Sequence, residues 1–118
     1  MKRVYSIKSQ TDIDLVFKEK KSVGNKYFAI YIKYHLLPHF KYALSIGKKY
    51  GNAVERNQAK RRIRYIISQN QKMIKSNKSF VIVVKPSVNE LKYKEIESNL
   101  IKLLIKADIL KKEETPNA

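Results

Sequence analysis

The sequence predicts an α/β (α+β) protein of one domain, in which helices pack on a mixed sheet in the order αββαβα. Two alternating segments and one unbroken apolar run supply three strands, and segments with apolar residues at helical spacing precede, separate and follow them. Of the 118 residues, 43% are hydrophobic, which suffices for one modest core. We therefore expect one domain over residues 1–110 and a flexible, solvated tail over residues 111–118.

The first half of the chain holds a short helix and two strands. Thr11 or Asp12 can cap a helix that ends at about Lys20. Residues 27–34 alternate as a strand, with Phe28, Ile30 and Ile32 on its core face and Tyr27, Ala29, Tyr31 and Lys33 on the opposite face. Residues 41–47 alternate likewise, with Tyr42, Leu44 and Ile46 toward the core and Ala43, Ser45 and Gly47 away from it. The second set is small and polar, and leaves a shallow floor that a base can approach closely.

The second half of the chain begins with a basic helix over about residues 54–74. Residues 80–84, FVIVV, are apolar without interruption and mostly β-branched, which predicts a central strand buried on both faces. Asn89 can cap a last helix over about residues 90–110, whose apolar side chains recur at helical spacing.

Positive charge dominates the composition. The 26 Lys and Arg residues against 10 Asp and Glu give a formal net charge of +16, which indicates a partner that is a nucleic acid or an anionic membrane. A membrane is the poorer choice, because no apolar run approaches the roughly 18 residues that span a bilayer and no signal or lipidation motif is visible. The absence of cysteine excludes disulfides and fits a reducing cytoplasm, where we expect the protein to act.

The charge is densest in the segment GNAVERNQAKRRIR, residues 51–64, and in the two lysines before it. The cations of residues 48–64 are Lys48, Lys49, Arg56, Lys60, Arg61, Arg62 and Arg64, and the one acid among them is Glu55. On a helical wheel the arc from about 40° to 140°, beside the predicted core stripe, holds Lys60, Arg64, Asn57 and Arg61, while Arg62 lies outside it. Like charges at this spacing repel one another. A solvated face is one explanation, and a polyanionic partner is a better one.

Residues with a capacity for catalysis are few. His35 and His39 lie in a predicted loop beside Pro38 and are interpreted as surface residues. Asp12 and Asp14 resemble a metal-binding pair, but carboxylates in a first helical turn are explained by the helix dipole. No glycine-rich phosphate loop or serine elbow is present. We therefore predict no catalytic residue and no small-molecule substrate.

Three motifs resemble those of a known family, the protein subunit of bacterial ribonuclease P. The segment GNAVERNQAKRRIR resembles the family signature of Gly-Asn-Ala-Val, any residue and Arg-Asn-Arg, continued by Lys-Arg and a final Arg. LSIGKKYGNAV resembles the Leu-Ser-Val-Ser-Lys-Lys lead-in, and SVGNKYFAIY resembles the Ser-Val-Ala-Asn segment before the first strand. The resemblance covers nearly the whole chain, from Ile13 to the last helix.

The resemblance implies an accessory subunit of an endoribonuclease in which a large catalytic RNA removes the 5′ leader from precursor tRNA. The protein would bind the catalytic RNA and the leader, aid magnesium-dependent catalysis and broaden the substrate range. Mg²⁺ would be held mainly through the RNA. The implied fold is similar to the second domain of a small-subunit ribosomal protein, with a left-handed crossover through the basic helix, a minority arrangement.

The resemblance also assigns site residues. The positions that would meet the catalytic RNA are Lys48, Lys49, Asn52, Arg56, Asn57, Lys60, Arg61 and Arg64. Phe17 and Tyr31 match aromatic positions of the leader-binding cleft, although Phe17 could instead be a core side chain. Tyr27, Lys33 and Ser45 join them, because basic grooves with aromatic rings bind single-stranded RNA.

Three departures from the family pattern stand out. Gln58 replaces the second arginine of Arg-Asn-Arg, Ile13 replaces an aromatic residue of the cleft, and Gly47 replaces a serine. We interpret them as tuning of RNA affinity. The alternative function is a structural RNA-binding protein of the ribosome or another ribonucleoprotein, which shares the charge and the fold. The ordered signature favours the ribonuclease P subunit.

Overall fold

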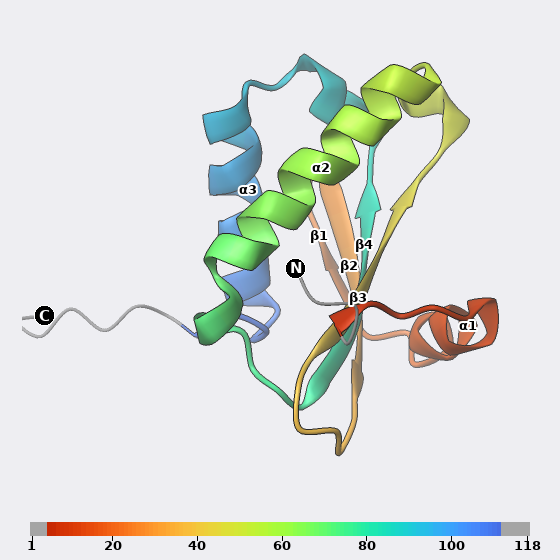
Figure 1. The fold of residues 1–118 in the computed structure, drawn as a ribbon, viewed down its shortest axis with the longest axis vertical. Helices are drawn as coiled ribbons and strands as arrows, with labels where there is room; N and C mark the ends of the chain where they lie inside the picture. The colour runs from red at the N-terminus through yellow and green to blue at the C-terminus, as the bar shows by residue number, and fades with distance from the viewer. Residues whose placement is uncertain (1–4, 112–118) are drawn as a thin grey trace, which may run out of the picture.

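The computed structural model describes residues 5–111, which form a four-stranded sheet with helices on both faces (Figure 1). The helices are α1 (Gln10–Lys18), α2 (Ala53–Gln69) and α3 (Tyr93–Lys106), and the strands are β1 (Ser22–Gly24), β2 (Phe28–Tyr34), β3 (Lys41–Ile46) and β4 (Lys78–Val84). Short 3₁₀ turns cover Lys48–Tyr50 (η2), Gln71–Met73 (η3) and Pro86–Glu90 (η4). The order αβββαβα confirms the predicted elements and adds one strand, β1.

The sheet is mixed, with the strand order β1-β2-β4-β3. β4 pairs antiparallel with β2 and parallel with β3, so the parallel pair is joined through α2. Since β4 has a partner on each side and Val81 and Ile82 are both fully buried, the prediction of a central strand buried on both faces is confirmed.

The main core lies between one face of the sheet and the two long helices. Phe28, Ile30 and Ile32 of β2 are buried there, as the alternation predicts. The apolar stripes of the helices meet them with Ala59, Ile63, Ile66 and Ile67 from α2 and Ile96, Leu100, Leu103 and Leu104 from α3. The core therefore fixes the angular position of α2, and with it the direction in which the basic arc points.

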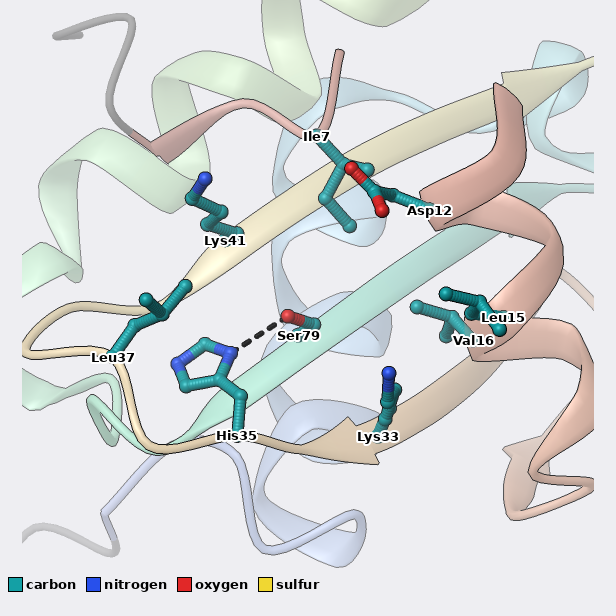
Figure 2. Close-up of a pocket in the computed structure, with 9 residues that line it drawn as sticks. All are labelled: Ile7, Asp12, Leu15, Val16, Lys33, His35, Leu37, Lys41 and Ser79. Carbon is teal, nitrogen blue, oxygen red and sulfur yellow. Dashed lines mark hydrogen bonds between the residues drawn. The ribbon is translucent and has the colours of Figure 1, made fainter. Parts of the chain in front are cut away.

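The other face of the sheet is covered only in part, by α1. This helix contacts β2 and β4, and Val16 is its one buried residue. Because a single short helix crosses this face, a pocket is left at one end of the sheet, between α1 and the start of β3 (Figure 2).

Several predicted boundaries of the first half need correction. α1 is capped by Ser9 and not by Thr11 or Asp12, because the Ser9 hydroxyl accepts from the Asp12 backbone N–H at 3.1 Å. The helix ends at Lys18, and Lys20 has a positive φ of 57°. β1 has only three residues, too few for an alternating pattern, and it exists because it pairs with β2.

The observed element boundaries of the second half of the chain also differ from the predicted ones. α2 ends at Gln69, five residues before the predicted end, because the Asn70 side chain donates to the Ile66 carbonyl. β4 begins at Lys78, two residues before the predicted strand. α3 begins at Tyr93, and Asn89 is not its cap. Lys111, the first residue of the predicted tail, donates its backbone N–H to the Met73 carbonyl at 2.8 Å. The rest of the predicted tail, residues 112–118, lies outside the described residues.

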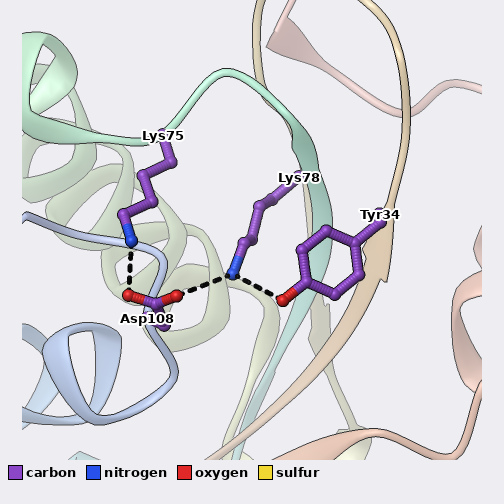
Figure 3. A network of polar contacts seen from close by, with 4 residues as sticks. All are labelled: Tyr34, Lys75, Lys78 and Asp108. Atoms are coloured by element: carbon purple, nitrogen blue, oxygen red, sulfur yellow. Dashed lines mark hydrogen bonds and ion pairs between the residues drawn. The ribbon is translucent and has the colours of Figure 1, made fainter.

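A buried lysine ties the start of β4 to the end of α3 (Figure 3). The Lys78 side chain is 2% exposed, and its Nζ lies 3.5 Å from Asp108 Oδ2 and 4.6 Å from the centre of the Tyr34 ring. Lys75 pairs with the other oxygen of Asp108. The hydrogen bond from Lys75, with the charges of Lys78 and Lys75, lowers the pKa of Asp108. One exposed carboxylate thus balances two lysines, one of which is buried.

Asp108→Asn is therefore expected to lower the free energy of unfolding at neutral pH. Asn tolerates the left-handed backbone at this position, where φ is 61°, so the change isolates the charge. Because the pKa of Asp108 is lowered in the folded state, its stabilisation is complete above the ordinary value of 3.8 and is lost as the pH falls through the folded-state value. Urea unfolding of both proteins at pH 7 and pH 3 measures this. A stability difference that is as large at pH 3 as at pH 7, or that Glu90→Gln reproduces, would contradict this prediction.

Candidate nucleic-acid interface

Four hydrogen bonds made by side chains fix the start of α2. The Asn52 side-chain oxygen accepts from the Glu55 backbone N–H at 2.8 Å, and a Glu55 carboxylate oxygen accepts from the Asn52 backbone N–H at 3.0 Å. The Asn89 amide donates to the other Glu55 oxygen at 3.0 Å and to the Tyr50 carbonyl at 2.9 Å. The Asn89 side chain, followed by the Asn52 backbone, lowers the pKa of Glu55. The one acid of this segment is thus bound to the helix start.

Gly51 leaves room for the Glu55 carboxylate, which approaches it closely at this start. A Cβ at Gly51 would lie 2.6 Å from Glu55 Oε1 and 2.9 Å from Glu55 Cδ, closer than unbonded atoms can come. The glycine of the signature therefore allows the capping arrangement that sets the direction of α2.

The basic residues project from η2 and from the exposed side of α2. Lys48, Lys49, Arg61 and Arg64 are exposed, and Arg56 and Lys60 are half-buried beside the core stripe. Within residues 5–111 the ion pairs are those of Asp108 with Lys75 and Lys78, so none of these six cations has a carboxylate partner there. The prediction that the cations of the helix share one side of it, next to the core residues, agrees with the half-buried state of Arg56 and Lys60.

Arg64 shows which way this basic arc points. Burial raises the pKa of the Tyr42 hydroxyl, and the positive charge of Arg64 lowers it in part. Tyr42 belongs to β3, so Arg64 lies on the side of α2 that is nearer to this strand. Tyr65, which lies outside the arc, instead has its ring centre 6.4 Å from that of Tyr93 on α3.

The second candidate surface lies on the sheet face that α1 partly covers. The rings of Phe17 and Tyr31 meet edge to face, with centres 4.8 Å apart, and both residues are half-buried. Phe17 is half-buried and lies outside the main core, so the alternative that it is a core side chain is wrong. Ser45 is exposed on β3, and Lys33 lines the pocket at the end of the sheet.

Tyr27 departs from the predicted alternation. It lies in a bend before β2, where Asn25 Oδ1 accepts from the backbone N–H groups of Tyr27 and Phe28 at 2.8 Å each. Its ring packs against the main core. The expectation that it shares a face with Tyr31 is therefore wrong, because the strand pattern does not extend through the Asn25 turn.

His35 is more embedded than a surface loop residue. Its Nδ1 lies 2.7 Å from the Ser79 hydroxyl, and its Nε2 lies 2.9 Å from the His39 carbonyl and 2.6 Å from the Ser76 carbonyl. The ring therefore ties the β2–β3 loop to the start of β4. No local signal in the sequence identifies this role, since Ser79 is 44 residues away.

The described part of the chain contains no group of three or more His, Cys, Asp or Glu side chains arranged to hold a metal ion. None of its helices combines the length and the apolar character needed to cross a membrane.

Known proteins match this chain in sequence and in fold. The ribonuclease P family model matches residues 1–108. The ribonuclease P protein component of Acholeplasma laidlawii is 65% identical over 113 residues, which are 96% of this chain and 97% of that protein. The Staphylococcus aureus RNase P protein structure matches with a TM-score of 0.84 and 28% identity, covering 91% of this chain and 98% of that one. The Thermotoga maritima RNase P protein matches with a TM-score of 0.79 and 25% identity, covering 86% and 96%.

The fold and the unpaired basic helix define an RNA-binding α+β protein without a metal cluster in its described part. The chain belongs to the family of ribonuclease P protein components. Its function is that of the protein component of this endoribonuclease, which processes the 5′ ends of precursor tRNA.

Proposed function

We propose that this protein binds the catalytic RNA of ribonuclease P through η2 and α2. The proposed contacts are Lys48, Lys49, Asn52, Arg56, Asn57, Lys60, Arg61 and Arg64. The observation that supports this most strongly is that the six cations among them have no carboxylate partner within residues 5–111. Clustered cations repel one another, and a phosphate backbone supplies the missing negative charge.

The 5′ leader of precursor tRNA is proposed to bind on the opposite face of the sheet. Phe17 and Tyr31 offer ring edges and faces for base stacking, Ser45 belongs to a floor of small residues, and Lys33 offers a charge for a phosphate. Tyr27 is left out of this cleft because its ring packs against the core.

These two surfaces suggest how the protein assists a catalytic RNA. Binding energy from the basic helix fixes the protein on the RNA, and the cleft then holds the leader beside the cleavage site. We propose that Mg²⁺ is held mainly by the RNA, since residues 5–111 offer no ligand cluster of their own. The protein acts in the cytoplasm, together with the RNA.

Family membership also supports a left-handed β3-α2-β4 crossover and a fold like that of the second domain of a small-subunit ribosomal protein. The parallel pairing of β3 with β4 through α2 is the connection for which handedness is defined. An experimental structure would test this directly.

Cleavage of a precursor tRNA by the Acholeplasma laidlawii ribonuclease P RNA at low magnesium tests the proposed function. The reactions contain the RNA alone, this protein alone, or both. Efficient leader removal is expected only with both, because the protein lowers the electrostatic cost of bringing the two RNAs together. Cleavage by the protein alone would contradict the assignment of catalysis to the RNA. Binding without any effect on cleavage would favour a structural ribonucleoprotein role instead.

A further inference from the structure

The exposed surface of α2 continues past the basic arc onto a second side of the helix. Val54, Gln58, Arg61 and Tyr65 recur at spacings of three or four residues, so they line one side of α2, and all four are exposed. This side points away from the core stripe of the helix, and Figure 1 shows α2 at the front of the molecule. Arg61 belongs both to this side and to the basic arc, so the two surfaces are continuous.

Two large apolar side chains lie on this outward side of α2. Val54 is 77% exposed and Tyr65 is 55% exposed. Arg61 lies one turn before Tyr65 and has no carboxylate partner within residues 5–111. An open aromatic ring beside an unpaired cation is the combination with which proteins bind single-stranded nucleic acid, because the ring stacks on a base and the cation binds a phosphate.

The ring of Tyr65 is supported by Tyr93, the first residue of α3. Their ring centres are 6.4 Å apart, with the ring planes inclined by 56°. Tyr93 packs against the main core, and its hydroxyl is enclosed without a hydrogen-bond partner in the described part of the chain. Burial, followed by the charge of Glu97 and by Tyr65, raises the pKa of Tyr93. A fixed neighbour thus restrains Tyr65, which reduces the entropy that its ring loses when a ligand binds.

Packing against Tyr93 does not by itself explain an aromatic ring at this position. The next two residues, Ile66 and Ile67, are fully buried and already join α2 to the core, whereas more than half of the Tyr65 surface stays open to solvent. The surrounding charge indicates the occupant of this open surface, since residues 48–64 carry seven cations and one acid. That excess of positive charge complements a polyanion, so a nucleic acid fits this side of the helix better than a protein does.

We propose that Tyr65 stacks on the base of an unpaired nucleotide of the catalytic RNA while Arg61 binds a phosphate beside it. Four residues of helix rise by about 6 Å, a separation that one nucleotide spans between its phosphate and its base. Gln58 lies on the same side of α2, and its amide can donate to and accept from the adjoining ribose or base. The inference rests on the proposed function and adds to the basic helix a contact that involves no charge.

Binding of the Acholeplasma laidlawii ribonuclease P RNA over a series of salt concentrations tests this contact. Tyr65→Leu keeps an apolar side chain against Tyr93 but cannot stack, so it is expected to weaken binding by about tenfold. The slope of log affinity against log salt should stay unchanged in this variant, because no phosphate contact is lost, whereas Arg61→Ala should reduce the slope. Tyr65→Phe keeps the ring and should retain the affinity of the unchanged protein.

Fluorescence gives a second measurement, because the chain contains no tryptophan. Tyr65→Trp introduces a single indole, which should support RNA binding and lose about half or more of its emission when a base stacks on it. Leu36→Trp is the matched control, since Leu36 is fully exposed in the β2–β3 loop and lies outside both proposed RNA surfaces. Its emission should change little when the RNA binds.

The outcomes separate this inference from the proposed function. Binding of Tyr65→Leu within about twofold of the unchanged protein, with Arg61→Ala weakened, would overturn the stacking contact and leave the proposed function standing. Equal losses in Tyr65→Leu and Tyr65→Phe would overturn it as well. If Tyr65→Leu does not fold, the tryptophan variants decide, and equal quenching at positions 65 and 36 would contradict the inference. Failure of the unchanged protein to bind the RNA would overturn both.

Discussion

Raising the salt concentration from 50 to 200 mM is expected to weaken binding of this protein to ribonuclease P RNA by about a thousandfold. The proposed interface offers six cations that have no carboxylate partner within residues 5–111, and each phosphate contact contributes roughly 0.7 to 0.9 to the slope of log affinity against log salt. Arg61 is an exposed member of this arc. Arg61→Ala should weaken assembly at every salt concentration and reduce the slope by about one contact.

Filter binding or fluorescence anisotropy over a series of salt concentrations measures both effects. Lys102→Ala is the matched control, because it removes one exposed cation from α3 and leaves α2 unchanged. The basic arc is fixed by the core packing of Ala59 and Ile63, so Arg61→Ala should leave thermal stability unchanged. A flat salt dependence would argue against electrostatic binding, and equal effects of the two variants would remove Arg61 from the interface.

Tyr31→Ala is expected to reduce discrimination between precursor and mature tRNA by about tenfold and to have little effect on binding of the catalytic RNA. A base stacked on an aromatic ring contributes roughly 1 to 3 kcal/mol to the binding free energy. The Phe17 ring packs against the Tyr31 ring, with ring centres 4.8 Å apart. Mature tRNA has no leader, so only the affinity for the precursor depends on this ring.

Affinities of the holoenzyme for both tRNA forms measure this discrimination. Tyr31→Phe keeps the ring and should retain it, which separates stacking from loss of the hydroxyl. Phe17→Ala should act in the same direction, and because the two rings touch, the double variant should lose less than the sum of the single losses. Equal losses for precursor and mature tRNA would place Tyr31 outside the leader cleft.

Local patterns in the sequence predict most of this fold because they reflect local geometry. The alternation of residues 28–34 predicts which side chains of β2 are buried and that Tyr31 points away from the core. The unbroken apolar run of residues 80–84 predicts the central place of β4 in the sheet. The helical wheel gives the basic arc of α2, since its cations and its core stripe follow one period. The family motifs point to the same protein as the comparisons do.

Features that depend on partners far apart in the chain could not be predicted in this way. β1 exists through its pairing with β2, and Asn89 serves the start of α2 rather than that of α3. The fold buries Lys78 against Asp108 and Tyr34, and no pattern in the neighbouring sequence indicates this burial.

The sequence by itself therefore determined the class of fold, the basic helix and the family of this protein. Only the tertiary structure decided which side chains meet. Lys33, Ser79 and Lys41 form one row because their strands are in register, and Asp12 comes to that row because α1 crosses the sheet there. Register and helix placement are set by packing of the whole core, a sum of many weak contacts that no short segment encodes.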